Sequence, residues 1–307
     1  MNFIFLSGRC HAPGWTARLW VLALCLCWVG AARALPPVSH SNAQPARVAV
    51  DDAGRIYVSD PAAGSVFVYD GTLGALGEIG GLDLPLGVAA DSARNRLYVG
   101  DDERDRIEVF DLDGAFIETI AAGEVQMPND LALDSAGNVY VADSLGNVVR
   151  VYSPDGAWLR NIGVGIVSFP ASVVVSGSEL YVADQINFKI RVFSLTGSQL
   201  RSFGAKIPGF GAFSPGSFVK LQSLAVDNYG YVHAGDCYMN NVQMLHPSTG
   251  AYKTVYGSYG TDPGGLNLPL DLAFVQEGVM VVANTRNHRV ELISYPIVTA
   301  VEDWLIH

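Results

Sequence analysis

The sequence predicts an all-β fold, a six-bladed β-propeller built from four-stranded antiparallel blades. The first observation is a strand-like segment with a closing Asp or Asn that recurs six times in the 307 residues. The second is its period: successive closing residues lie 41, 42, 41, 52 and 48 positions apart, the length of one propeller blade. The third is that another strand-like segment follows each closing residue. The closing residues are Asp60, Asp101, Asp143, Asp184, Asp236 and Asn284.

The clearest single unit spans residues 127–163 and contains four β-prone segments, residues 130–133, 138–142, 148–152 and 158–162. Turn residues separate them, because Asp134 to Gly137 and Pro154 to Gly156 combine an Asp that bonds its own backbone with a Gly that accepts a positive φ. A lone meander of this length cannot bury both of its apolar faces. The unit therefore needs neighbours on each side.

The flanks of the repeat divide residues 45–296 into six blades. A Pro opens the first strand of five blades, at Pro45, Pro85, Pro128, Pro170 and Pro269, and we place Gln222 at that position in the fifth. The predicted blades are residues 45–81, 82–123, 124–165, 166–211, 212–260 and 261–296. Strand period, turn residues and repeat length all agree, which is typical of a sequence that specifies one fold.

The first 34 residues differ in kind from the rest. Arg9 and Arg18 precede an apolar run at residues 19–29, and a small-x-small motif follows at Ala32 to Ala34. This is the pattern of a secretory signal peptide, and the run is shorter than the roughly 20 residues of a membrane span. We predict export to the periplasm or cell exterior, without stable membrane insertion after cleavage. An uncleaved anchor is the alternative.

Charge and cysteine content exclude several classes of function. The first 34 residues hold three of the 19 basic residues and none of the 30 acids, so the remainder has 16 basic residues and a net charge of −14. Such a surface repels nucleic acid and anionic lipid. Three of the four cysteines lie in the signal, and Cys237 alone remains. We therefore expect no internal disulfide, and a blade-edge thiol at Cys237 rather than a nucleophile.

The repeats resemble the NHL family, named for its Asn-His-Leu signature. The shared pattern is P-x-x-[VL]-A-[VL]-D-x-x-G-x-x-Y-V-A-D-x-x-N-x-[RK]-[VI]-x-V-F, and blade six keeps Asn287, His288, Arg289 and Val290. The resemblance covers roughly residues 45–296 and implies a six-bladed propeller. One propeller fold hosts many activities. The resemblance to secreted NHL propellers implies an interaction platform, and RNA binding, which some members perform, is opposed by the acidic charge.

The sequence at the two ends of the predicted propeller does not determine which strand closes the ring. Residues 35–44 are a short stub that we do not expect to form a full closing strand. The tail, residues 297–307, follows the last repeat without an Asp-Gly turn. Residues 297–301 could supply the outer strand of blade six or pair elsewhere on the rim.

Two inter-blade connections are long and aromatic. Residues 203–219 join blades four and five, and residues 255–269 join blades five and six. Long loops on a rigid scaffold often carry binding sites, although these rings could also pack between blades. The candidate binding residues are Phe210, Phe213, Phe218, Tyr256 and Tyr259.

The repeated Asp that closes each second strand suggests at first a ring of catalytic carboxylates. Because it occurs in nearly every blade, an architectural role is favoured, in which the carboxylate accepts hydrogen bonds from backbone N–H groups of the following turn. The same interpretation applies to the acids that close first strands, Asp51, Asp91, Asp134 and Asp227.

Polar residues just after the repeated Pro are unequal across the blades, as a site would require. We expect them at the entrance of the central channel, where the first strands begin. The candidates are Arg47, Asn129, Asp130, Ser172 and Asp271. Oxygen atoms of Asn129, Asp130 and Asp271 could bind a hard cation such as Ca²⁺, or could satisfy backbone groups around a wet channel. We predict no other cofactor.

Two related enzyme families provide a residue-by-residue test. The gluconolactonase and SMP-30 type resembles residues 128–134, which would place its metal-binding Asn at Asn129. Its companion Asp would fall near Leu270, which cannot ligate, and Ala46 and Arg47 stand where an acidic first-blade ligand is needed. The peptidyl-amidoglycolate lyase type holds zinc through histidines. No two of His40, His233, His246, His288 and His307 occupy equivalent positions that converge on the channel.

The sequence therefore predicts a secreted or periplasmic, non-enzymatic propeller. Its partner would be a protein, peptide or polysaccharide, met on the face that carries the inter-blade loops. The alternative is a cation-dependent lyase or lactone hydrolase with its site in the channel at Asn129, Asp130 and Asp271.

Overall fold

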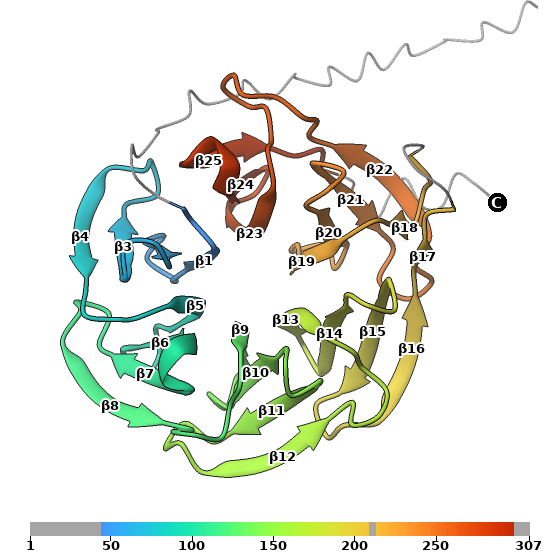
Figure 1. The fold of residues 1–307 in the computed structure, drawn as a ribbon. Helices are drawn as coiled ribbons and strands as arrows, with labels where there is room; N and C mark the ends of the chain where they lie inside the picture. The colour runs from blue at the N-terminus through green and yellow to red at the C-terminus, as the bar shows by residue number, and fades with distance from the viewer. Residues whose placement is uncertain (1–43, 209–212, 298–307) are drawn as a thin grey trace, which may run out of the picture. The chain divides into compact units, whose positions relative to one another are not determined.

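The computed structural model of the protein describes residues 44–208 and 213–297. These residues form six antiparallel sheets arranged as blades around a central axis (Figure 1). The predicted all-β, six-bladed propeller is confirmed. The predicted signal at 1–34, the stub up to residue 43, Phe210 and residues 298–307 of the tail lie outside the described residues. Within the described ranges, no helix is long and apolar enough to cross a membrane.

Blades one to three are regular four-stranded meanders in which strand order follows the sequence. Blade two has one 3₁₀ turn, η1 (Asp102–Arg104), between its second and third strands. The strands are β1 (Arg47–Val50), β2 (Ile56–Asp60), β3 (Ser65–Tyr69), β4 (Ala75–Ile79), β5 (Pro85–Asp91), β6 (Arg96–Asp101), β7 (Arg106–Phe110), β8 (Phe116–Ile120), β9 (Pro128–Leu133), β10 (Val139–Asp143), β11 (Val148–Tyr152) and β12 (Trp158–Ile162).

Blades four and five repeat this arrangement, and blade six has three strands within the described ranges. The long connection between blades four and five contains a short parallel pair, β17 (Ala205–Lys206) and β18 (Ser217–Phe218). A second 3₁₀ turn is η2 (Thr285–Asn287). The remaining strands are β13 (Pro170–Ser176), β14 (Glu179–Asp184), β15 (Lys189–Ser194), β16 (Gln199–Phe203), β19 (Leu221–Val226), β20 (Val232–Asp236), β21 (Asn241–Leu245), β22 (Tyr252–Tyr256), β23 (Pro269–Gln276), β24 (Val279–Asn284) and β25 (Arg289–Ser294).

The acid that closes a second strand accepts hydrogen bonds from two separate segments of the chain. In blade three, the buried Asp143 accepts hydrogen bonds from Gln126 N (3.1 Å) and Met127 N (3.3 Å), before the first strand. It also accepts from Gly146 N (3.1 Å) and Arg150 Nε (2.6 Å), in the next turn and strand. The carboxylate thus joins the inter-blade connection to the turn between β10 and β11. The predicted architectural role of this residue is confirmed.

The hydrophobic core is divided into six clusters, each between two neighbouring blades. Strand side chains alternate between the two faces of a blade, and each face packs on the facing side of the next blade. The cluster between blades three and four, for example, joins Tyr140, Val149 and Val151 to Val173 and Phe193. In the described residues each buried cluster is shared by two blades, which agrees with the expectation that one repeat needs neighbours.

The ring closes by packing of blade six against blade one. Val48, Ile56 and Val58 of blade one share a buried cluster with Val281 and Leu292 of blade six. The hydroxyl of Thr285 also donates to the carbonyl of Pro45 at 2.7 Å. Of the tail, residues 297–307, for which an outer strand of blade six was one alternative, Ile297 alone lies within the described residues, and it is exposed.

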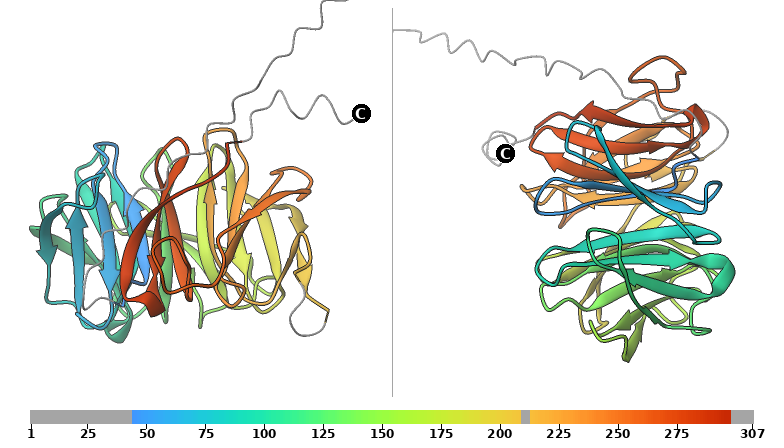
Figure 2. Two further views of the ribbon diagram at one scale, coloured as in Figure 1. Left: turned by 90° about the horizontal axis from the view of Figure 1, so that it is seen from above. Right: turned by 90° about the vertical axis from the view of Figure 1, so that its left-hand side faces the viewer.

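The meander gives the ring two different faces. Successive turns of an antiparallel sheet lie at opposite ends of its strands. The turns between second and third strands therefore share one face with the inter-blade connections, and we call this the connection face. The turns between first and second strands and between third and fourth strands lie on the opposite face, which we call the hairpin face. Figure 2 shows both faces edge-on.

Candidate functional site

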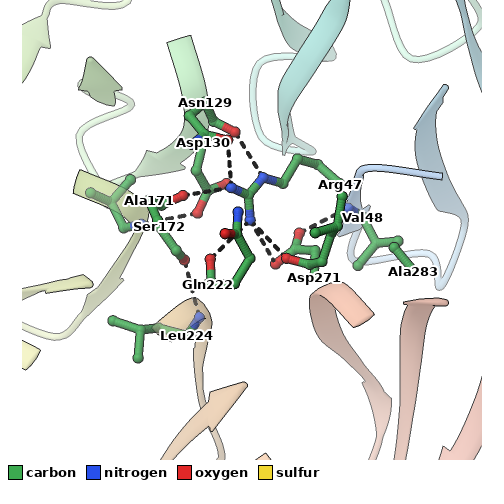
Figure 3. Close-up of polar contacts among 12 residues, drawn as sticks. Arg47, Val48, Asn129, Asp130, Ala171, Ser172, Gln222, Leu224, Asp271 and Ala283 are labelled. Carbon is green, nitrogen blue, oxygen red and sulfur yellow. Dashed lines mark hydrogen bonds and ion pairs between the residues drawn. The ribbon is translucent and has the colours of Figure 1, made fainter. Parts of the chain in front are cut away.

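The polar residues predicted at the channel entrance do come together at the centre of the ring (Figure 3). Arg47, Asn129, Asp130, Ser172 and Asp271 are all buried. They lie on β1, β9, β13 and β23, which are innermost strands of four different blades. The structure therefore places residues up to 224 positions apart in the sequence around one point.

Strand register corrects the prediction for the fifth blade. Leu221 pairs with Asp236, as Pro170 pairs with Asp184 in blade four. Leu221 therefore replaces the repeated Pro, and the assignment of Gln222 to that position was wrong by one residue. The innermost position that follows reads Arg47, Gly87, Asp130, Ser172, Ser223 and Asp271 around the ring.

Arg47 extends across the channel and binds four of the other five blades. Its Nε donates to the carbonyl of Asn129 at 2.8 Å, and one terminal nitrogen donates to Asn129 Oδ1 at 2.6 Å and to the carbonyl of Ala171 at 2.5 Å. The other terminal nitrogen donates to the carbonyls of Leu270 at 3.0 Å and Gln222 at 3.3 Å. This nitrogen also lies 3.6 Å from Asp271 Oδ1.

All five N–H donors of the Arg47 guanidinium thus have acceptors, in blades three, four, five and six. A buried charge is tolerated only when it is paired and its hydrogen bonds are satisfied, and Arg47 meets both conditions. Its planar fork of donors suits a ring of carbonyl oxygens. The side chain therefore closes the channel at its level and ties the blades together.

Asp130, Ser172 and Asp271 each bind the free edge of the next blade. Asp130 Oδ2 accepts from Val173 N at 2.9 Å, and Asp271 Oδ2 accepts from Val48 N at 2.9 Å. Ser172 Oγ accepts from Leu224 N at 3.1 Å and hydrogen-bonds to Asp130. These N–H groups belong to innermost strands, which have no neighbouring strand on the channel side, so the side chains supply the missing acceptors.

Blade two has no side chain at this level. A Cβ on Gly87 would lie 2.9 Å from the backbone Cα and carbonyl carbon of Asp130, closer than such atoms approach. Blades two and three therefore approach each other more closely than a side chain would allow. Glycine is the residue that permits this contact.

Two carboxylates share one guanidinium in this buried cluster. Burial raises the pKa of Asp271 and of Asp130, and the positive charge of Arg47 opposes this rise. The ionised Asp130 raises the pKa of Asp271 further. With both carboxylates ionised the cluster carries one net negative charge. A further positive charge near these two groups would therefore be favourable.

A cavity of about 410 Å³ lies in the channel next to the cluster, on the side of the hairpin face. It is lined by the innermost strands of all six blades, between the cluster and the first turns. Most lining side chains are Val, Leu and Ala, and Asp130 and Asp271 are the carboxylates among them. Arg47 does not line the cavity. A molecule in this space would therefore meet the carboxylates and not the guanidinium.

The aromatic loop candidates separate into exposed and buried residues. Tyr259 is exposed, and Phe213 is exposed with an edge-to-face contact to Tyr252 at 5.8 Å between ring centroids. Phe218 is fully buried in the core between blades four and five, so its selection as a surface-binding residue was wrong. Tyr256 packs against the core between blades five and six and is likewise not a free surface residue.

The sequence did not predict the polar contacts of Tyr256. Its hydroxyl lies 2.5 Å from His233 Nδ1, and His233 Nε2 lies 3.0 Å from Asp227 Oδ2. In blades one and three a Tyr at this second-strand position bonds the corresponding Asp, as Tyr57 bonds Asp51 at 3.1 Å. His233 fills the same role in blade five. The replacement of Tyr by His at this position is visible in the sequence and could have predicted the contact. The contact itself has an architectural role.

Cys237 is the free thiol among the described residues, and it is buried. Burial, followed by the charge of Asp236, raises its pKa to about 12. A thiol with this pKa is almost entirely protonated at neutral pH and is a poor nucleophile. Cys237 is therefore an inert buried side chain.

The connection face carries exposed apolar side chains that the sequence did not reveal. One turn position, two residues after the closing acid, reads Ala62, Glu103, Leu145, Ile186, Tyr238 and Arg286 around the ring. Leu145, Ile186 and Tyr238, in consecutive blades, are 57–58% exposed. The connections add exposed Val164, Ile166 and Tyr259 to this face. We call these six residues the apolar patch.

Comparison with known proteins identifies the family. Residues 33–186, half of the chain, match the family described as SMP-30/Gluconolactonase/LRE-like region. The chain belongs to this family. The NHL family suggested by the repeat pattern is a related propeller, and the matching family model does not name it. No curated protein sequence matches the chain.

Solved structures support the same fold for this SMP-30/gluconolactonase-like chain. A chain of Kuenenia stuttgartiensis hydrazine synthase aligns with a TM-score of 0.62 at 15% identity, over 85% of this chain and 98% of that one. A streptogramin B lyase structure aligns with a TM-score of 0.61 at 13% identity, over 85% of this chain and 86% of that one. At these identities the likeness concerns the fold alone.

The cation that the gluconolactonase resemblance implies does not fit the residues present. Asn129 Oδ1, its expected ligand, accepts a hydrogen bond from Arg47, and the nearby carbonyl of Leu270 accepts another. The guanidinium thus uses the oxygen atoms that would surround a cation, and its charge would repel one at this place. Within the described ranges, no group of three His, Cys, Asp or Glu side chains is arranged as a metal site.

Proposed function

We propose that the protein is an exported, non-enzymatic propeller that binds a protein or peptide partner on its connection face. The observation that carries the non-enzymatic part is Arg47, whose guanidinium occupies the centre of the channel and engages Asn129 and Asp271. A reactive group needs free donors or acceptors directed at a substrate. In this cluster all donors of Arg47 are bonded to other blades, and Asn129, Asp130 and Asp271 each accept a hydrogen bond that joins neighbouring parts of the ring.

The apolar patch supports the choice of the connection face. Contiguous exposed apolar side chains on a folded protein mark interaction surfaces. The turn position that contributes Leu145, Ile186 and Tyr238 differs in every blade, so these side chains are not required by the repeat. Aliphatic and tyrosine side chains favour a protein or peptide partner over a polysaccharide. Glu103 and Arg286 of the same turn position flank the patch and would orient the partner.

Family membership favours a second candidate, a lactone hydrolase or lyase with its site in the channel. A streptogramin B lyase is among the solved structures that share this fold. The residues that would carry it are Asn129, Asp130 and Asp271, and all three are engaged with Arg47 or with backbone N–H groups. We rank this candidate second for that reason.

Site-specific photo-cross-linking in the native cell tests the partner surface. A photoreactive amino acid replaces Ile186, which is 58% exposed in the apolar patch, or Phe116, which is 59% exposed on the outer strand β8. We expect one discrete protein adduct from position 186 and none from position 116, which serves as the control of equal exposure. Equal adducts from both positions, or none from position 186, would contradict the proposal.

A further inference from the structure

The channel cavity has the properties of a small-molecule site that the partner surface does not explain. Its volume of about 410 Å³ falls within the range of ligand pockets, roughly 300–1,000 Å³. It lies on the side of the hairpin face, whereas the apolar patch lies on the connection face. The two features are therefore independent, and an inference about the cavity does not rest on the proposed partner.

The wall of the cavity is apolar, and the end formed by Asp130 and Asp271, which we call its floor, is acidic. Val50, Leu133, Val174, Val226 and Phe274 belong to the residues that line it, each from a different blade or strand. Such a wall excludes ions that carry a full hydration shell, and it favours a ligand with an apolar body. The described residues that line the cavity include no Lys, Arg or His.

With both carboxylates ionised, the negative charge on the floor exceeds the positive charge beside it. Asp130 and Asp271 face the cavity, and Arg47, the one positive side chain bonded into the cluster, lies behind them and has no free N–H. Asp130 accepts hydrogen bonds from Val173 N and Leu131 N, both at 2.9 Å, and from Ser172. Asp271 accepts from Val48 N at 2.9 Å and from Leu272 N. A carboxylate has about four lone-pair sites. Both groups therefore retain acceptor capacity.

Backbone acceptors complete the floor. The innermost strands of a propeller have no hydrogen-bonding partner on the channel side, so part of their carbonyl groups face the cavity. A primary ammonium group has three N–H donors and no acceptor. Two carboxylates and a carbonyl oxygen are a suitable set of partners for it, and hydrogen bonds between charged groups are the strong ones.

We propose that this cavity binds a small organic cation, a primary amine whose ammonium group contacts Asp130 and Asp271 and whose apolar body packs against the valine, leucine and phenylalanine wall. The fit rests on the cavity, on the two carboxylates that open into it and on the absence of basic side chains among its described lining residues. An anion would meet uncompensated negative charge. A neutral molecule of the same shape would leave the excess negative charge of the two carboxylates uncompensated.

Matched ligands test this site directly. Benzylamine, benzyl alcohol and benzoate have similar bodies and differ in charge, and calcium chloride serves as an inorganic cation. We expect millimolar benzylamine to raise the melting temperature of the full chain by about 2 °C or more, with saturable binding by calorimetry. Benzyl alcohol and benzoate should give no saturable shift. A shift by Ca²⁺ in place of benzylamine, or by benzoate, or by no ligand, would overturn the proposal.

Variants then locate the site. Asp271→Asn should weaken benzylamine binding by about tenfold or more, since a charge-assisted hydrogen bond is lost. Asp113→Asn, at a turn where the side chain is 83% exposed, should leave it unchanged. Because Asp271→Asn could disturb the fold, Ala90→Leu provides a second variant that fills the cavity from its wall without touching the carboxylates. Unaltered binding in both Asp271→Asn and Ala90→Leu would contradict this location.

Discussion

Replacing Arg47 by methionine is expected to lower the free energy of unfolding by about 3–5 kcal/mol. The substitution removes a buried charge and leaves Asp130 and Asp271 without a positive neighbour. It also leaves the carbonyls of Asn129 and Leu270 without these donors. Removing one member of a buried charge cluster is costly because the remaining charges stay desolvated. Equilibrium unfolding in urea measures the change, and the midpoint should fall while the slope stays constant.

Two further variants separate this effect from the loss of an arginine in general. Arg94→Met removes a partly exposed arginine that pairs with Asp91 at 2.9 Å, and it should cost at most about 1 kcal/mol. In Arg47→Met, adding Asp271→Asn removes one of the unpaired carboxylates and should restore part of the lost stability. If Arg47→Met were no more costly than Arg94→Met, Arg47 would not be the residue that joins the blades.

Truncation of Asp143 to alanine should be the second largest effect, about 3–5 kcal/mol of unfolding free energy. The reason is the number of groups that lose their acceptor. Three backbone N–H groups, of Gln126, Met127 and Gly146, and the side chain of Arg150 all depend on this carboxylate. Thermal and chemical unfolding of the purified variant measure the loss.

Blade six has an Asn in place of the closing Asp, which suggests Asp143→Asn as a control for Asp143→Ala. Asn284 stands at the equivalent position, where its Oδ1 accepts from Asn267 N at 2.8 Å. Asp143→Asn keeps one acceptor oxygen and should therefore cost clearly less than Asp143→Ala. Asp155→Ala, in an exposed turn of the same blade, should change stability by about 0.5 kcal/mol or less. Equal losses for Asp143→Ala and Asp155→Ala would contradict the architectural role.

The six blades could be predicted because the turn residues that delimit their strands lie close to those strands in the sequence. The turn residues after Leu133 and around Asp155 lie within a few positions of the strands that they connect. Where the local signal weakened, the prediction failed by one residue. In blade five Leu221 replaces the repeated Pro, and it follows the long connection from β16. Without that Pro the sequence does not mark where the first strand begins, and the prediction of Gln222 was wrong by one residue.

The meeting of the channel residues could be predicted, but the role of Arg47 could not. Strand order places Asn129, Asp130 and Asp271 near the axis, and this follows from the repeat alone. The direction of the Arg47 side chain depends on carbonyl groups of four other blades, up to 223 residues away. Those groups converge only after the ring closes. From the sequence alone, Arg47 is therefore one polar residue among several.

The sequence also does not determine which aromatic residues of the long connections are exposed and which are buried. Phe218 and Phe213 lie five residues apart in one connection, and their composition gives no reason to separate them. Phe218 belongs to the short pair of β17 and β18 and packs into the core beside Leu221. Phe213 stays on the surface. Which aromatic residue is exposed depends on the path of the loop, which local propensity does not determine.

The guanidinium of Arg47 takes the place of a cation in the channel. Metal analysis of the full chain, purified without chelators, tests it most directly, together with melting curves in EDTA and in excess Ca²⁺. We predict substoichiometric metal and a melting temperature that neither EDTA nor Ca²⁺ changes. One tightly bound cation per chain, with a melting temperature that falls in EDTA and recovers with that cation, would contradict the claim.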